Sequence, residues 1–283
     1  MQIKKLNMRR IISYATLLVA VVFAACTQED ELAWDDEVVM TFCPVVDDAT
    51  SRAEAPVNSS VNTVVCAVFE NDRELPNLRD TFDLPYINPG ITYSPRLVKE
   101  HTYDVVFWAF NRGYYDVRNL QAITLNPDSI YGSRYDAFTK SIQVKASAAN
   151  DLRQTVLLTR PLAHLSFNVP ATYWNAIPEA GRPAMMKIEV PQVKSAYDAL
   201  AGSSTGADTV TYTLKVIGED TADGYKKLTS CFLLASPGGQ QVDVTYNIYK
   251  ENQDTPYVTR LISGVNIRAN YTTNINGELL GKN

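Results

Sequence analysis

The sequence predicts an all-β protein built from two β-sandwiches in tandem. Apolar and polar residues alternate with a period of two along much of the chain, which is typical of strands with one buried face. Turn-forming residues interrupt this pattern at strand-length intervals, and no long stretch has the 3.6-residue period of an amphipathic helix. The 283 residues exceed the usual size of one compact domain, so we expect two, at 37–160 and 161–283.

Residues 1–25 have the composition of a secretory signal. Basic residues precede a short apolar run that ends in Phe23-Ala24-Ala25-Cys26, and this run is short for a membrane span. The acidic residues 26–36 that follow have no apolar periodicity, so we expect a solvated tether. The sequence therefore predicts an exported protein.

The first half opens with a predicted strand at 37–46. Small, polar and proline-containing residues follow around Arg52, which predicts an exposed backbone there that suits a trypsin-like protease. The apolar run 61–69 predicts a buried central strand. Segments 91–97 and 101–110 predict a hairpin, and the second is apolar on both sides, so both of its faces should be covered. Two further strand patterns complete this half, at 135–146 and 152–159.

The second half opens with a strand at 163–169, whose alternation of apolar and polar residues predicts one buried face. Residues 195–201 predict one or two helical turns. Further strand patterns recur at 186–190, 210–216 and 242–248.

The chain offers few groups for catalysis or metal binding. His101 and His164 are the only histidines, and each falls at the end or on the polar face of a predicted strand, where an ordinary histidine is a better interpretation than a catalytic base. The sequence contains no nucleophile motif, no phosphate-binding glycine loop and no zinc-type cysteine spacing. We therefore predict no enzymatic activity, no catalytic or metal-binding residues and no cofactor.

The net charge and the tryptophans indicate which classes of binding partner to expect. The net charge is −5, and it becomes −9 without the four basic residues of the leader, which argues against nucleic acid as a partner. Trp108 lies in a strand pattern that is apolar on both faces and is expected in the core. Trp174 is expected to be the exposed tryptophan, and such aromatic faces can stack on sugars.

The cysteines beyond Cys26 are odd in number: Cys43, Cys66 and Cys231. At most one pair can form within a subunit. Cys43 and Cys66 fall in two early strands and could pair in an oxidising compartment. We favour three buried free thiols, because a disulfide would tether the first strand, and the pairing of Cys43 with Cys66 stays open.

Two motifs carry a family resemblance. Phe23-Ala24-Ala25-Cys26 resembles a bacterial lipobox, which implies that the Cys26 thiol is acylated and becomes the new N-terminus. The ending Asn270-Tyr271-Thr272-Thr273-Asn274-Ile275-Asn276-Gly277-Glu278-Leu279-Leu280 is similar to that of Bacteroidales fimbrillin-like lipoproteins. The order of lipidated cysteine, first strand, exposed arginine and folded body also resembles the fimbrillins, the subunits of type V pili.

The resemblance implies two transthyretin-like, Greek-key sandwiches and a surface-exposed position at the cell outer membrane through lipid on Cys26. It also implies that an arginine-specific protease cuts the Arg52–Ala53 bond, that strand 37–46 is lost and that a strand from another fimbrial subunit takes its place. The expected donor segment is C-terminal and carries alternating anchors: Val265, Ile267, Ala269 and Tyr271.

The implied function is a fimbrial subunit for adhesion to a host or bacterial target. Two alternatives stay open. One is an uncleaved anchor or tip subunit of a fimbrium. The other is a surface glycan-binding lipoprotein, which predicts exposed aromatic residues in one patch and no processing at Arg52.

Overall fold

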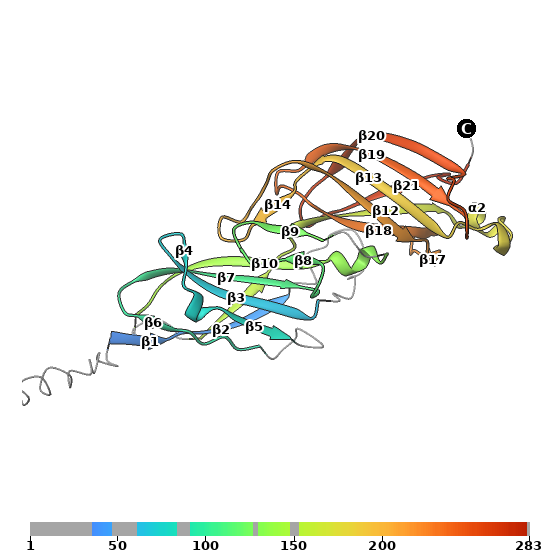
Figure 1. Cartoon of the computed structure of the whole chain (residues 1–283). Helices are drawn as coiled ribbons and strands as arrows, with labels where there is room; N and C mark the ends of the chain where they lie inside the picture. The colour runs from blue at the N-terminus through green and yellow to red at the C-terminus, as the bar shows by residue number, and fades with distance from the viewer. Residues whose placement is uncertain (1–35, 47–60, 84–90, 127–129, 148–152, 282–283) are drawn as a thin grey trace, which may run out of the picture.

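The computed structural model describes residues 36–46, 61–83, 91–126, 130–147 and 153–281. Strands dominate these residues, which confirms the predicted all-β fold. Figure 1 shows stacked sheets in an elongated molecule, with β1 and β2 at one end and the C-terminus at the other. Helical segments in the described residues are short: α2 (Ala171–Asn175) and three 3₁₀ turns, Pro76–Leu78, Gly132–Tyr135 and Glu179–Gly181.

A five-stranded antiparallel sheet forms the centre of the first half. β3 lies between β7 and the short strands β4 and β5, and β10 pairs with the other edge of β7. The apolar runs of β3 and β7 are buried on both faces, as predicted. The strands are β3 (Thr63–Glu70), β4 (Arg73–Glu74), β5 (Asp80–Asp83), β7 (Thr102–Phe110) and β10 (Ala137–Lys145).

A second layer covers one face of this sheet. The predicted first strand is confirmed as two pieces, β1 (Glu37–Val39) and β2 (Thr41–Val46). β1 pairs antiparallel with β6 (Arg96–Val98), and β2 pairs in parallel with β11 (Arg153–Leu158). The two layers share one apolar core, to which both contribute.

The hairpin predicted from 91–97 and 101–110 is wrong. β6 pairs with β1, whereas β7 pairs with β3 and β10. Between them Glu100 adopts a φ of 64°, and the chain crosses from one layer to the other. Leu97 and Tyr103 are consequently both buried in the core between the layers. A period of two identifies the buried face of a strand but not its neighbour.

The other face of the central sheet is covered by a sheet with strands from both sides of residue 160. Its order is β15-β14-β9-β8, and Trp108 of β7 meets Tyr197 of β14 with 5.4 Å between the ring centroids. The helical turns predicted at 195–201 are wrong, because Ala196 and Tyr197 form a ladder with β9 instead. The strands are β8 (Tyr115–Asp116), β9 (Ile123–Leu125), β14 (Ala196–Asp198) and β15 (Ser203–Thr205).

Two four-stranded sheets form the second half, in the orders β17-β18-β12-β21 and β16-β13-β19-β20. They pack through apolar side chains such as Phe167 and Tyr246, whose ring centroids are 5.9 Å apart. The strands are β12 (Leu162–Pro170), β13 (Met185–Val193), β16 (Asp208–Lys215), β17 (Glu219–Asp220), β18 (Tyr225–Leu234), β19 (Gln240–Tyr249), β20 (Val258–Ile267) and β21 (Thr272–Asn276).

Several side chains differ from expectation in their burial. β12 is buried on both faces rather than one, and His164 on its polar side is only 3% exposed. Trp174, expected to be exposed, is 6% exposed because α2 turns it toward the core, with Arg182 over its ring. Cys66 and Cys231 are buried free thiols, as favoured, and Cys43 is free but half-buried.

Candidate assembly site

The first strand occupies a slot with β11 on one side and β6 and the segment around Tyr93 on the other. On one edge, β2 pairs with β11 along its whole length. On the other edge, β1 pairs with β6, and Phe42 exchanges both backbone hydrogen bonds with Tyr93, at N···O distances of 2.8 and 2.9 Å. Segment 37–46 therefore has hydrogen-bond partners on both edges, although it is the first strand of the described residues.

The same strand closes the core of the first half. Alternate side chains point inward, and four apolar ones are 8, 3, 0 and 5% exposed: Val38, Met40, Phe42 and Val46. The Phe42 ring lies deepest and meets Phe107 of β7 edge-on, with 6.0 Å between the ring centroids. The alternation of the sequence in this strand thus produces one face that seals the core.

Tyr93 fixes the neighbouring wall of the slot. Its ring contacts both Phe42 and Phe107, each at 6.3 Å between centroids, and its hydroxyl donates to the Leu78 carbonyl. Burial, with smaller contributions from nearby groups led by Cys66, raises the pKa of this hydroxyl, so it remains a donor. The wall is therefore anchored independently of the first strand.

The buried side chains of the first strand contribute much of the stability of the first half. Burying a large apolar side chain contributes roughly 1.5–3 kcal/mol, so the four inward side chains contribute roughly 6–12 kcal/mol. A typical domain has a net stability of about 5–15 kcal/mol. Loss of this strand without a replacement would therefore remove stability comparable to that of the whole first half.

The predicted donor residues lie at the end of β20 and on the connection that follows it. Val265 and Ile267 end β20 and are 7 and 0% exposed, whereas Ala269 and Tyr271 lie on the connection to β21. β20 and β21 are edge strands of the two opposing sheets of the second half. β21 pairs in parallel with β12, the first strand of that half, just as β11 pairs in parallel with β2.

The remaining predicted site residues cannot be placed. Cys26, Arg52 and Ala53 lie outside the described residues, in 1–35 and 47–60. Sequence reasoning also missed the walls of the slot, the segment around Tyr93 and β11. The alternating pattern at 152–159 predicted β11 as a strand, but no local signal named its partner.

The described part of the chain offers neither a cluster of metal ligands nor a helix that could span a membrane. No group of three or more His, Cys, Asp or Glu residues there is arranged to hold a metal ion. Among the same residues, no helix is both long and apolar enough to cross a membrane.

Comparisons with known proteins return distant structural neighbours. A candidate adhesin from Bacteroides ovatus has 14% identity and a TM-score of 0.49, covering 82% of this chain and 79% of its own. A candidate polysaccharide-binding protein (DUF1812) from Bacteroides thetaiotaomicron has 13% identity, a TM-score of 0.48 and coverages of 78 and 79%. The fimbrial anchor protein Mfa2 from Porphyromonas gingivalis has 11% identity, a TM-score of 0.44 and coverages of 79 and 82%.

At the level of sequence, no curated protein matches the chain. One family model matches the chain, over residues 35–283, a range that includes every strand described above. The protein therefore belongs to DUF6562, a family of unknown function.

Proposed function

We propose that this chain is a fimbrillin-type pilin subunit. In this proposal it is exported as a lipoprotein acylated at Cys26, cut after Arg52 at the outer membrane and polymerised by donor-strand exchange into adhesive fimbriae. One observation carries the proposal: the first strand seals a core and is paired on both edges, yet it precedes the segment 47–60 that contains Arg52.

Cleavage would change how the first strand is held. Before the cut, β2 and β3 belong to one continuous chain, so the strand that dissociates returns at once. After the cut, segment 37–46 is bound without a covalent link and can leave. The vacated slot exposes unpaired N–H and C=O groups on β11 and around Tyr93, above an apolar groove. Another strand of alternating pattern relieves both defects by pairing there.

The C-terminal segment has the features of such a strand. Val265, Ile267, Ala269 and Tyr271 repeat the period of two with which the first strand fills the slot. Freeing this segment opens two ladders, that of β20 with β19 and that of β21 with β12, and both lie at the edge of a sheet. The slot lies in the first half and the predicted donor in the second, so exchange between two copies would join different surfaces, as in a head-to-tail filament.

Treatment with an arginine-specific protease tests the proposal. We expect the wild-type chain to yield a product that begins at Ala53 and forms oligomers resistant to mild denaturation, whereas Arg52→Ala remains whole and monomeric. The matched control is Arg118→Ala, because the Arg118 side chain is 90% exposed in an unrelated loop; this variant should behave as wild type. Cleavage elsewhere, or cleavage without oligomers, contradicts the polymerising role and favours an uncleaved anchor subunit.

A further inference from the structure

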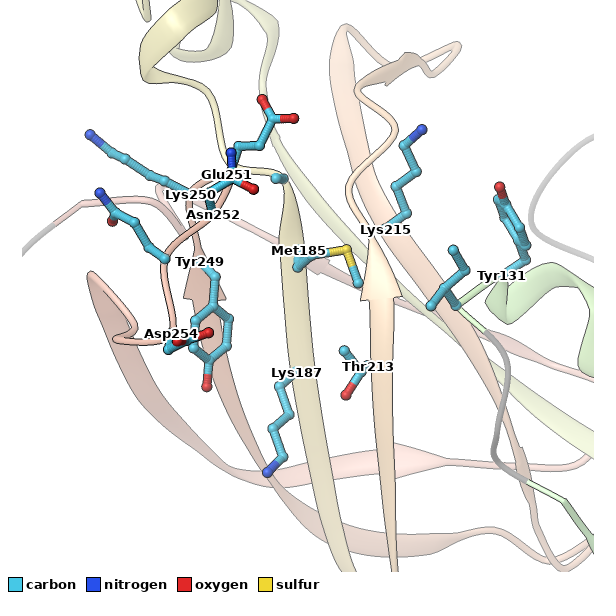
Figure 2. Close-up of a pocket in the computed structure, with 13 residues that line it drawn as sticks. Tyr131, Met185, Lys187, Thr213, Lys215, Tyr249, Lys250, Glu251, Asn252 and Asp254 are labelled. Atoms are coloured by element: carbon cyan, nitrogen blue, oxygen red, sulfur yellow. The ribbon is translucent and has the colours of Figure 1, made fainter.

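A depression lies on the outward face of the second half, away from the assembly slot. Its floor is formed by β13 and β16, and its walls by the β19–β20 hairpin and by the segment around Tyr131 (Figure 2). The depression is open to solvent and has a volume of about 690 Å³, within the range of about 300–1,000 Å³ typical of small-ligand sites. This face is solvent-facing, since the alternate side chains of β13 and β16 point to the core.

Two lysines mark the floor. Met185 pairs with Lys215, and Lys187 pairs with Thr213, so the two lysines are diagonal neighbours on adjacent strands. Neither ammonium group lies within ion-pair distance of a carboxylate of the described residues. Like charges on neighbouring strands repel. The charged side chains that line the depression are three lysines and two carboxylates (Lys187, Lys215 and Lys250; Glu251 and Asp254), so its charge is positive on a protein of net charge −5, and an anion near the lysines would be stabilised.

The two cations do not converge on one point. In Figure 2 Lys187 extends downward, below the level of Tyr249 and Thr213, whereas Lys215 extends upward, so the two ammonium groups point away from each other. A single small anion would satisfy only one of them. An extended ligand with separate acidic groups could meet both, with the depression filled by the part between.

The walls supply groups that suit rings bearing hydroxyls. Tyr131 is 44% exposed on one rim with Arg134 over its ring at 5.2 Å, and half-buried Tyr249 lies on the other side. The hairpin tip presents Asn252, Gln253 and Asp254, all exposed. Aromatic faces stack on the apolar faces of sugar rings, and planar amides and carboxylates hydrogen-bond hydroxyls.

We propose that this depression binds an acidic oligosaccharide. Lys187 and Lys215 contact separate acidic groups of the ligand, Tyr249 stacks on a sugar ring, and the hairpin tip binds hydroxyls. An acidic peptide would use the lysines equally well, but it offers no sugar ring to stack on Tyr249 and Tyr131 and no row of hydroxyls for the hairpin tip. The inference is independent of polymerisation, because none of these residues belongs to the first strand or to the predicted donor.

Calorimetric titration of the whole mature chain tests the site. The probes are hexasaccharides of galacturonate, hyaluronan and heparin, the methyl-esterified galacturonate hexasaccharide, and a glutamate hexapeptide. The variants are Lys187→Gln, Lys215→Gln and Tyr249→Leu, the last of which keeps an apolar side chain over the sheet. Lys140→Gln on β10 is the matched control, an exposed lysine far from this sheet.

We expect at least one acidic hexasaccharide to bind saturably, more weakly at high salt. Each lysine variant should weaken it about tenfold, the size of one lost charge-assisted hydrogen bond. Tyr249→Leu should weaken it as well, and Lys140→Gln should not. The proposal is overturned if no acidic saccharide binds, if the lysine and tyrosine variants bind like wild type, or if the glutamate peptide binds as tightly as the best saccharide.

Discussion

Replacing Phe42 with alanine should destabilise the uncleaved chain but not the assembled one. The Phe42 side chain is 0% exposed and contacts Phe107 and Tyr93 at 6.0 and 6.3 Å between ring centroids. Truncating a buried phenylalanine to alanine costs about 3–5 kcal/mol, from lost burial and the cavity left behind. We expect a loss of this size in the free energy of unfolding of uncleaved Phe42→Ala, measured by urea denaturation.

The polymer should respond to the same substitution differently from the uncleaved chain. If segment 37–46 leaves after cleavage, Phe42 is absent from the polymer, and polymers made from Phe42→Ala should unfold at the same urea concentration as wild type. Phe107→Ala should destabilise both forms, because Phe107 belongs to β7, which stays. Val39→Ala serves as the control within the first strand: Val39 is 40% exposed, and the change should stay within about 0.5 kcal/mol. Equal destabilisation of precursor and polymer by Phe42→Ala would refute the release of the strand.

Three further predictions concern the rest of the fold. Asp136→Ala should lower the free energy of unfolding by about 3–5 kcal/mol in urea denaturation, because it leaves the buried guanidinium of Arg160, whose Nε lies 2.6 Å from Asp136 Oδ1, without its carboxylate. Asp116→Ala, which removes an exposed ion pair with Arg118, should change nothing measurable. Burial, with smaller contributions from Lys227 and Arg160, lowers the pKa of His164 to about 3. Because the unfolded chain therefore takes up a proton that the folded chain does not, the free energy of unfolding should fall by about 1.4 kcal/mol per pH unit between pH 6.5 and pH 3, and His164 should add no pH dependence above pH 6.5. His164→Gln should lose this part of the pH dependence, and an unchanged slope would contradict the assignment. Burial raises the pKa of Cys231 to about 12 and that of Cys66 further, so mass spectrometry after brief thiol labelling of the native chain should find label at half-buried Cys43 alone among these three.

The elements of this fold are largely local, and for that reason the sequence predicts them. Residues 61–69 and 101–110 are apolar on both sides, and the structure buries both faces of β3 and β7. Residues 37–46 predicted a strand, which the structure confirms as β1 and β2. Burial pattern is a property of each segment by itself.

Which strands pair with each other is not a local property, and the sequence did not predict it. The parallel ladder between β2 and β11 joins the two ends of the first half, and no residue in either strand specifies the other. Tyr197 was assigned to a helical turn, yet its ring packs on Trp108 and its backbone joins β9, contacts that only the folded chain creates. Trp174 was expected at the surface because it lies in a connection between strands, but α2 turns it inward beneath Arg182.

The depression around Lys187 was also invisible to sequence reasoning. Its residues come from four separate segments, and each looks like an ordinary polar position on the outer face of a strand or hairpin. Only the register of β13 with β16 and β19 brings them together.

The most direct test of the account locks the first strand in place. Cys43 lies opposite Thr155 in the register of β2 with β11, at the spacing of neighbouring strands, about 4.8 Å, which a disulfide can span. In the Thr155→Cys variant, with the disulfide between Cys43 and the introduced thiol verified by mass spectrometry, we expect that cleavage after Arg52 yields no oligomers until a reductant is added. Denaturation-resistant oligomers that form with the bond intact would show that the first strand need not leave, and would contradict donor-strand exchange at this slot.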